Sequence, residues 1–233
     1  MRHVPDSLMV FAAGFGTRMG ALTAERPKPL IPVAGRCLLD HALDQADGLG
    51  LRRIVVNLHY RGEQIAEHLQ ARPEIALSWE RAQILETGGG LRHSLPLLGE
   101  GPVFTLNSDA VWAGANPLRL LANHWDAGRM DALLLLAEPE AALGYGGSGD
   151  FTLEADGRIT RATAGGLAYL GAQILNPAGL AGIAQTAFSL NLLWDKMIAE
   201  GRAFGLRYPG GWCDVGRPEG IAMAETMLRA QDV

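Results

Sequence analysis

A glycine-rich loop near the N-terminus has residue types that could bind an anionic ligand. Residues 12–20 read Ala-Ala-Gly-Phe-Gly-Thr-Arg-Met-Gly and follow an apolar run. Glycines let the backbone approach a ligand closely, and successive N–H groups can form an anion-binding nest. A dinucleotide fingerprint would need glycine where Met19 stands, and a P-loop would need lysine after Gly20. The glycines alone are equally compatible with an ordinary turn.

A positively charged segment follows this loop. Lys28 stands between Pro27 and Pro29, whose rings restrict the backbone on both sides of the lysine. A lysine held in this way is a positioned point charge that suits a phosphate, although a solvated lysine in a proline-rich loop would look the same. Because Arg18 lies ten residues upstream, the two cations could flank a polyphosphate placed over the glycine loop.

Two aspartates are candidate metal ligands. Asp109 follows the apolar run 103–107, and Asp214 lies in a short stretch closed by Gly216. Mg²⁺ prefers oxygen ligands and is usually held by one or two carboxylates together with substrate phosphates. An aspartate after a strand can equally form a turn, so these residues alone leave both interpretations open.

Short apolar runs alternate with helical patterns over the first 137 residues. The predicted strands are 8–12, 53–57, 75–79, 103–107 and 132–136, and the predicted helices are 38–49, 61–70, 90–97 and 117–127. Such alternation predicts βαβ units in a mixed, mostly parallel sheet flanked by helices. Because ligands of open α/β sheets bind at the carboxyl ends of the strands, the site is expected there.

The pattern changes after Glu138. The segments 151–154 and 158–163 flank Asp156-Gly157, a pair typical of a type I′ hairpin turn. A further strand is predicted at 167–175, and helices at 190–200 and 218–230. We expect an antiparallel C-terminal portion that extends the same sheet along one rim of a cleft, within a single domain of 233 residues.

Composition excludes several classes of protein. Hydrophobic residues make up 48% and charged residues 19%, which is typical of a globular chain. A net charge of −5 argues against a nucleic-acid-binding surface. The longest apolar runs are too short to span a membrane. Cys37 and Cys213 have no metal-binding spacing, so reduced thiols in a cytoplasmic protein are expected.

Five motifs together resemble the signature of the sugar-1-phosphate nucleotidyltransferases, also called NDP-sugar pyrophosphorylases. They are Ala-Ala-Gly-Phe-Gly-Thr-Arg-Met at 12–19, Arg-Pro-Lys-Pro-Leu-Ile-Pro-Val-Ala-Gly at 26–35, Leu-Glu-Thr-Gly-Gly-Gly at 85–90, Asn-Ser-Asp at 107–109 and Trp-Cys-Asp-Val-Gly at 212–216. The resemblance implies a Rossmann-like α/β nucleotidyltransferase fold, with a nucleotide-binding half (1–137) and a sugar-binding half (138–233). It also implies transfer of a nucleotidyl group to a sugar 1-phosphate, with release of pyrophosphate and use of Mg²⁺.

The short chain and the Glu-Thr-Gly-Gly-Gly form are most similar to the branch that uridylylates N-acetylmuramate α-1-phosphate in bacterial cell-wall (peptidoglycan) recycling. Two positions depart from the family pattern. Ala21 stands where proline is common, and Ser108 replaces the glycine of Asn-Gly-Asp. Both lie near the expected cleft and affect the substrate assignment more than the reaction assignment.

The resemblance also implies roles for individual residues. Asp109 and Asp214 match the metal-binding aspartates, Arg18 would hold the β- and γ-phosphates, and Lys28 would orient the attacking phosphate. No general base is needed, because a sugar phosphate with a second pKa of about 6 is mostly ionised at neutral pH. The implied nucleotide-binding residues are Ala12, Ala13, Gly14, Gly16, Thr17, Thr87 and Gly88. Thr87 could instead, or in addition, cap the following helix.

The sugar-binding residues are less clearly marked. Asn107 leads to Asp109 along the strand, whereas Asp150 and Gly171 match the family's sugar-facing strands only loosely, and Asp150 could equally be a hairpin-edge residue. Trp112, Trp125 and Trp194 are expected in the core, and His59 is assigned no role.

Three alternatives remain open at this stage. A guanylyltransferase acting on mannose 1-phosphate or a heptose phosphate would use the same chemistry. A non-catalytic nucleotide-sugar sensor is possible, although retention of Arg18, Lys28, Asp109 and Asp214 together argues against it. A dinucleotide oxidoreductase is disfavoured by Met19 and by Asn57, which stands where an acidic residue would end the second strand. The expected partners are small-molecule substrates, and the oligomeric state is not predicted.

Overall fold

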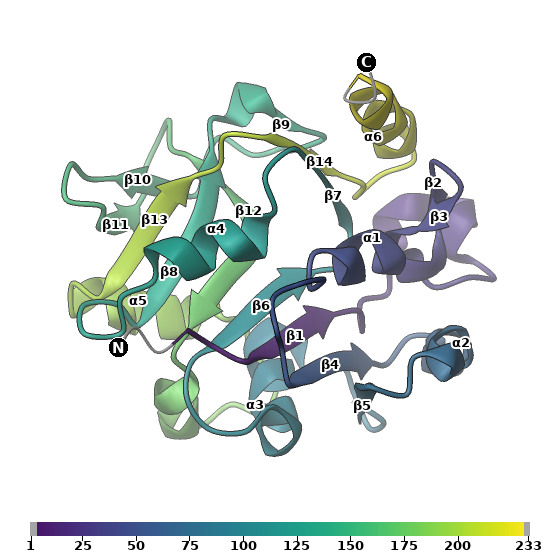
Figure 1. Ribbon diagram of the computed structural model, residues 1–233, viewed down its shortest axis with the longest axis horizontal. Helices are drawn as coiled ribbons and strands as arrows, with labels where there is room; N and C mark the ends of the chain where they lie inside the picture. The colour runs from purple at the N-terminus through teal and green to yellow at the C-terminus, as the bar shows by residue number, and fades with distance from the viewer. Residues whose placement is uncertain (1–3, 231–233) are drawn as a thin grey trace.

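A seven-stranded mixed sheet forms the centre of the computed structural model, which describes residues 4–230 (Figure 1). Its strand order is β13-β8-β12-β6-β1-β4-β5. The strands are β1 (Ser7–Phe11), β4 (Arg53–Leu58), β5 (Ile75–Trp79), β6 (Val103–Asn107), β8 (Ala132–Ala137), β12 (Ala168–Leu175) and β13 (Ala203–Arg207). Only β12 runs antiparallel to its neighbours, β6 and β8. The predicted mixed, mostly parallel α/β sheet is confirmed.

Helices cover both faces of the sheet, because its strands are apolar on both sides. Along β1, Leu8 and Val10 belong to one buried cluster and Met9 to the other, as the period of two in a strand requires. The first cluster lies under α1 (Leu38–Asp44), α2 (Gly62–His68) and α4 (Pro117–His124). The second lies under α3 (Glu86–Leu98) and α5 (Asn191–Ala199).

Smaller sheets flank the central one. β14 (Gly211–Asp214) lies between β7 (Ala110–Ala113) and β9 (Ala142–Leu143), and α6 (Glu219–Arg229) packs against it (Figure 1). Two-stranded hairpins pair β2 (Pro32–Val33) with β3 (Arg36–Cys37) and β10 (Phe151–Leu153) with β11 (Ile159–Arg161). Short 3₁₀ helices complete the fold: η1 (Thr17–Thr23), η2 (Lys28–Leu30), η3 (Leu69–Ala71), η4 (Pro139–Ala141) and η5 (Pro177–Gly182).

The C-terminal part joins the central sheet in a different way from the prediction. β12 does extend it in antiparallel fashion, but β13 pairs parallel with β8, and the β10–β11 hairpin forms a sheet of its own. The hairpin turn is not type I′, which needs positive φ at both central residues. Only Gly157 has positive φ there (+88°), and Glu154 and Arg158 still pair across the loop, which leaves a three-residue connection.

The largest differences from the predicted helix boundaries are in α1 and α3. The helix expected over 38–49 ends at Asp44, after which the chain continues through turns with i→i−3 hydrogen bonds and reaches Gly48 and Gly50, both with positive φ. The helix expected at 90–97 begins at Glu86 and contains the three glycines, despite their low helix propensity. Close packing against other segments explains the glycines: a Cβ on Gly89 would lie 2.5 Å from the Thr186 carbonyl oxygen. Among the described residues, no helix has both the length and the apolar character needed to cross a membrane.

Truncating a side chain at the centre of the core should lower the free energy of unfolding. Phe104 on β6 is fully buried at the centre of the sheet, so Phe104→Ala should lower the free energy of unfolding by about 3–5 kcal/mol through lost burial and a residual cavity. Urea denaturation checks this value. Leu97→Ala is the control, since Leu97 is 41% exposed and its truncation should change stability by less than about 0.5 kcal/mol. Equal losses in the two variants would contradict the assignment of the core.

Candidate active site

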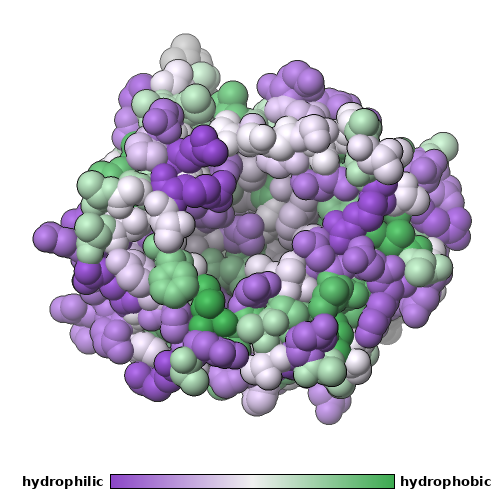
Figure 2. Space-filling model, turned by 180° about the vertical axis from the view of Figure 1, so that it is seen from behind, coloured by the Kyte–Doolittle hydropathy of each residue, from purple (hydrophilic) through white to green (hydrophobic). Residues whose placement is uncertain are grey.

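A cavity of about 230 Å³ lies at the carboxyl ends of β1 and β6. The glycine loop, Lys28, Asp109 and Gly216 line it, and a second cavity of about 200 Å³ adjoins it, since both include Gly14 and Asp109. Seen from behind, the surface of the molecule is hollowed near its centre, with hydrophilic side chains on opposite sides of the depression (Figure 2). The site therefore lies where the topology of an open α/β sheet predicts it.

The glycine loop packs directly on the lysine segment. Gly16 has φ +64°, and a Cβ there would lie 2.9 Å from the Lys28 Cβ, so only glycine fits this backbone and this contact. Gly14, Gly16 and Thr17 line the larger cavity with Ala12, and Ala13 lines the smaller one. Met19, which breaks the dinucleotide fingerprint, is buried in the apolar cluster under α6. It therefore serves packing, and the loop differs from a dinucleotide-binding turn.

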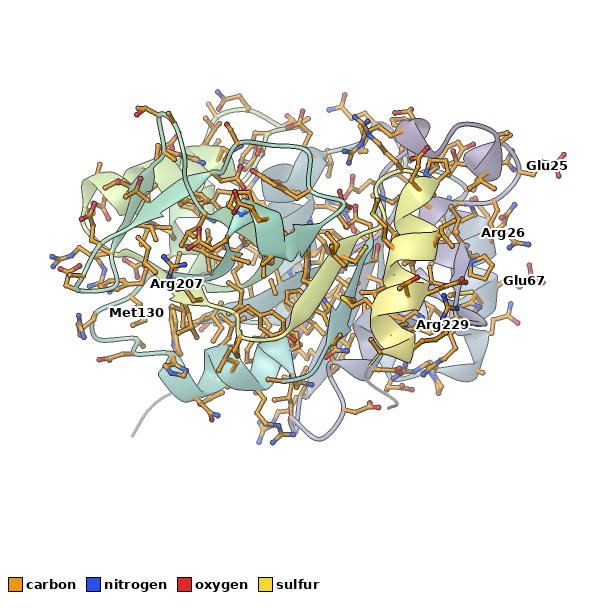
Figure 3. All side chains as sticks on the ribbon, turned by 90° about the horizontal axis from the view of Figure 1, so that it is seen from above. Glu25, Arg26, Glu67, Met130, Arg207 and Arg229 are labelled. Atoms are coloured by element: carbon orange, nitrogen blue, oxygen red, sulfur yellow. The ribbon has the colours of Figure 1, made fainter. Side chains whose placement is uncertain are left out.

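The two predicted cations, Arg18 and Lys28, line the same cavity but differ in burial and in ion pairing. Lys28 is only 7% exposed, and its Nζ lies 2.8 Å from Asp109 Oδ2. Arg18 is exposed in the lining and makes no hydrogen bond or ion pair with another described residue. The lysine is thus fixed in place, whereas the guanidinium is free to receive an anion. Arg26, two residues before Lys28, points away from the molecule (Figure 3).

The two aspartates converge through the β7–β14 pairing. Asp214 faces Ala110, the residue after Asp109, and the Val215 N–H donates a hydrogen bond of 2.9 Å to the Asp109 carbonyl. Burial and then the nearby charge of Asp109 raise the pKa of Asp214 to about 6, while Lys28 and Arg18 act in the opposite direction. Two carboxylates that repel each other suit a hard divalent cation, because the cation prefers oxygen ligands and neutralises their charge. The expected convergence of the two aspartates is present.

The glycine-rich start of α3 is bonded to the 186–190 segment. The Thr87 hydroxyl accepts a hydrogen bond from the Leu190 N–H, and the α3 N-cap residue is Leu85, so Thr87 does not cap the helix. The Gly88 N–H donates to the Phe188 carbonyl, and a Cβ on Gly88 would lie 2.4 Å from the Phe188 ring. Thr87 lines the smaller cavity. Nucleotide binding by Thr87 and Gly88 remains a prediction.

The structure brings together two of the three predicted sugar-binding residues. Asn107 lines the smaller cavity. Gly171 lies at an irregularity of β12 and has φ +80°. It packs so closely against Asn107 that a Cβ on Gly171 would lie 2.7 Å from Asn107 Nδ2. Asp150 instead accepts a hydrogen bond from the Tyr169 N–H and holds the start of β12. The lining residues of the two cavities do not include it. All three sugar contacts remain predictions.

Sequence reasoning missed a buried polar pair beneath the glycine loop. Asn57 Oδ1 accepts the Ala12 N–H at 2.8 Å, and Asn57 Nδ2 donates to Glu80 Oε1 at 2.6 Å. Glu80 Oε2 also accepts the Leu85 N–H, so the pair ties β1, β4 and the approach to α3 together. Both residues stand at the carboxyl ends of adjacent strands. The rule that singled out Asp109 would have found them if it had been applied to every strand.

Ser108, three tryptophans and His59 have structural contacts near the site or in the core. The Ser108 hydroxyl donates to the Phe11 carbonyl at 2.6 Å, so this departure from the family pattern joins the ends of β1 and β6. Trp112, Trp125 and Trp194 are buried, as predicted. A ring nitrogen of His59 lies 2.6 Å from the Glu80 carbonyl, which gives that histidine a structural contact.

A cavity at the strand ends that is lined by a glycine loop, two cations and Asp109, with Asp214 beside Asp109, is the arrangement expected of a nucleotidyltransferase. The chain belongs to the MobA-like NTP transferase family, whose domain matches residues 8–146. It is 43% identical to the N-acetylmuramate alpha-1-phosphate uridylyltransferase of Caulobacter vibrioides, over 98% of this chain and 99% of that protein. The enzyme of the same name from Neisseria meningitidis is 32% identical, over 89% of this chain and 92% of that protein.

A UDP-glucose pyrophosphorylase solved with UDP-glucose shares the fold, with a TM-score of 0.77 and 17% identity over 95% of this chain and 97% of that one. The family resemblance seen in the motifs is confirmed.

Disrupting the Asn57–Glu80 pair should affect both stability and nucleotide binding. Glu80→Gln replaces one of two accepting oxygens by an NH₂ group that faces a donor, so a buried donor loses its partner. We expect the free energy of unfolding to fall by roughly 1–3 kcal/mol and the KM for the nucleotide to rise, because the glycine loop loses its anchor. Denaturation and initial-rate kinetics measure both. Glu63→Gln is the control, because the Glu63 side chain is 76% exposed; matching effects in the two variants would contradict the proposed anchor.

Proposed function

We propose that this protein transfers the uridylyl group of UTP to N-acetylmuramate α-1-phosphate, releasing pyrophosphate and forming UDP-N-acetylmuramate. The observation that carries the proposal is that Arg18, Lys28 and Asp109 line one cavity, and that Asp214 lies close enough for its carboxylate to interact with the charges of all three. Relatives from two organisms that carry this activity in their names match nearly the whole chain, which supports the choice of nucleotide and sugar.

Positioning and electrostatics account for the chemistry. The ionised sugar phosphate attacks the α-phosphorus, an oxygen–phosphorus bond forms, and the bond to the leaving pyrophosphate breaks. Lys28 sits deep in the cavity, where its fixed charge can orient the attacking phosphate near the α-phosphate. Arg18, at the exposed lining, can hold the β- and γ-phosphates as negative charge builds on them. Preorganised charges of this kind lower the barrier between two anions without a general base.

Asp109 and Asp214 are the proposed Mg²⁺ ligands. When bound, Mg²⁺ would neutralise charge on the nucleotide phosphates and on the leaving pyrophosphate. Asp109 has a second contact, the ion pair with Lys28. This ion pair fixes the position of the lysine Nζ in the cavity.

The proposal extends to the two halves of the chain and to its location. The loop and cations within 1–137 would bind the nucleotide, and 138–233, which brings Gly171 against Asn107, would complete the sugar site. A cytoplasmic location agrees with the two free cysteines, Cys37 and Cys213. A guanylyltransferase is the second candidate function, since the chain is also 26% identical to a mannose-1-phosphate guanylyltransferase subunit over 91% of its length.

Isotope labelling tests the type of transfer. With UTP labelled at the α-phosphorus, label should appear in the nucleotide-sugar product, and with UTP labelled at the γ-phosphorus it should appear in pyrophosphate. Release of γ-label as orthophosphate would show hydrolysis of the β–γ phosphoanhydride bond and would contradict uridylyl transfer.

A further inference from the structure

A thiol, a carboxylate and an imidazole meet on the side of the molecule formed by α1 and α2. The Cys37 Sγ, an Asp40 carboxylate oxygen and a His68 ring nitrogen all lie within 4.8 Å of one another. None of these three residues lines the cavities of the candidate active site. The cluster is therefore separate from the carboxylate pair and is not used by the proposed reaction.

The fold holds each member of this cluster on regular structure. Cys37 ends β3 and precedes α1, and Asp40 lies three residues later in the first turn, so both side chains project from the same side of that helix. His68 is the last residue of α2, and its Nε2 lies 2.8 Å from Asp40 Oδ1. Cys37 is also tied to the segment after Lys28, because its backbone pairs with Pro32 and its Sγ lies 3.5 Å from the Leu30 carbonyl oxygen.

These three groups are the donors that zinc-class cations select. Cysteine sulfur, histidine nitrogen and aspartate oxygen bind zinc at about 2.0–2.3 Å, which places tetrahedral ligand atoms about 3.4–3.7 Å apart. Only small side-chain movements are needed to reach this spacing from the observed one. Mg²⁺ selects oxygen ligands and does not favour a thiolate. This cluster and the Asp109–Asp214 pair should therefore prefer different metal ions.

We propose that Cys37, Asp40 and His68 form a second metal site, for a divalent cation of the zinc class. Three protein ligands leave the fourth tetrahedral position to water, and the side chains of His68 (31% exposed) and Asp40 (24% exposed) make the site accessible. The Cys37 thiol loses its proton to solvent on binding, and the His68–Asp40 hydrogen bond is replaced by bonds to the cation. The bound ion would join α1 to α2 and to the strand hairpin that follows Lys28.

Cobalt titration tests the proposal, since Co²⁺ substitutes for Zn²⁺ and shows a sulfur-to-cobalt charge-transfer band only when a thiolate is bound. The full chain is titrated with Co²⁺ in excess Mg²⁺, so that the Asp109–Asp214 pair does not compete. We expect the band to saturate near one equivalent of Co²⁺, to vanish in Cys37→Ser, and to require at least tenfold more Co²⁺ in His68→Gln. Cys213→Ala, which removes the other thiol, and His93→Gln, which removes a histidine on α3, should leave the titration unchanged.

Thermal unfolding with Zn²⁺ gives a second readout that does not depend on activity. Zn²⁺ should raise the Tm of the wild type and of His93→Gln but not that of Cys37→Ser, because only the intact cluster binds the ion in the folded state. Absence of the charge-transfer band in folded wild-type protein, or its persistence in Cys37→Ser, would overturn the proposal. So would a Zn²⁺-induced rise in Tm that is equal in the wild type and in Cys37→Ser.

Discussion

Asp214→Asn is expected to lower kcat by about a hundredfold to a thousandfold while leaving the protein at least as stable as the wild type. Activity falls because the amide removes one negative charge from the proposed cation site. Stability is kept because partial burial and then the charge of Asp109 both oppose ionisation of Asp214, and the isosteric amide removes both costs. Pyrophosphate-release kinetics at saturating substrates and urea denaturation of the metal-free protein measure the two quantities.

The opposite directions of these two effects make the test specific. A residue that only supports the fold would lose activity and stability together. Asp195→Asn is the matched control, because Asp195 lies on α5 with a side chain that is 56% exposed, and both quantities should stay near the wild-type values. A kcat for Asp214→Asn within threefold of the wild type would remove Asp214 from the cation site.

Arg18→Ala and Lys28→Ala are each expected to slow the chemical step by more than tenfold. They differ in their effect on stability. Arg18 is exposed, and its side chain makes no hydrogen bond or ion pair with a described residue, so its removal should change the unfolding free energy little. Lys28 is nearly buried and paired with Asp109 at 2.8 Å. Its removal leaves a carboxylate without its cation and should also destabilise the fold.

Single-turnover rates isolate the chemical step in these variants, and Arg26→Ala provides a charge-matched control on the same segment. Arg26 points into solvent (Figure 3), so its loss should change the rate by less than twofold. Near wild-type rates in Arg18→Ala or in Lys28→Ala would refute the role assigned to that residue. An equally large effect in Arg26→Ala would indicate a general effect of positive charge instead of positioned groups.

Local sequence patterns sufficed for the elements that carry the site. The strands at 75–79 and 103–107 were placed to the residue, because apolar runs bounded by polar residues mark buried strands. Asp109 follows such a strand directly and Lys28 stands between prolines, but these positions alone fit a turn and a solvated lysine equally well, and the family motifs are what point to metal and phosphate binding. The burial of Lys28 and its pairing with Asp109 agree with a fixed charge.

The contacts that could not be predicted join residues distant in the sequence. The Asn57–Glu80 pair depends on β4 lying beside β5, and the Cys37–Asp40–His68 cluster depends on how α1 and α2 pack. The start of α3 was placed too late because glycine's low helix propensity predicts a loop, whereas the 186–188 segment packs where side chains would stand. The alternative role of Thr87 as a helix cap is wrong, because its hydroxyl accepts a hydrogen bond from the Leu190 N–H.

Pyrophosphate release across a matrix of substrates tests the central claim most directly. UTP, GTP, CTP, ATP and dTTP are each combined, with Mg²⁺, with a panel of sugar 1-phosphates that includes N-acetylmuramate α-1-phosphate. The account predicts release with UTP and the muramic sugar, and little with other pairs. A preference for GTP with a mannose or heptose phosphate would keep the mechanism and replace the substrates. Silence across the matrix, in a folded protein that still binds a nucleotide, would contradict the account and indicate a nucleotide-sugar sensor.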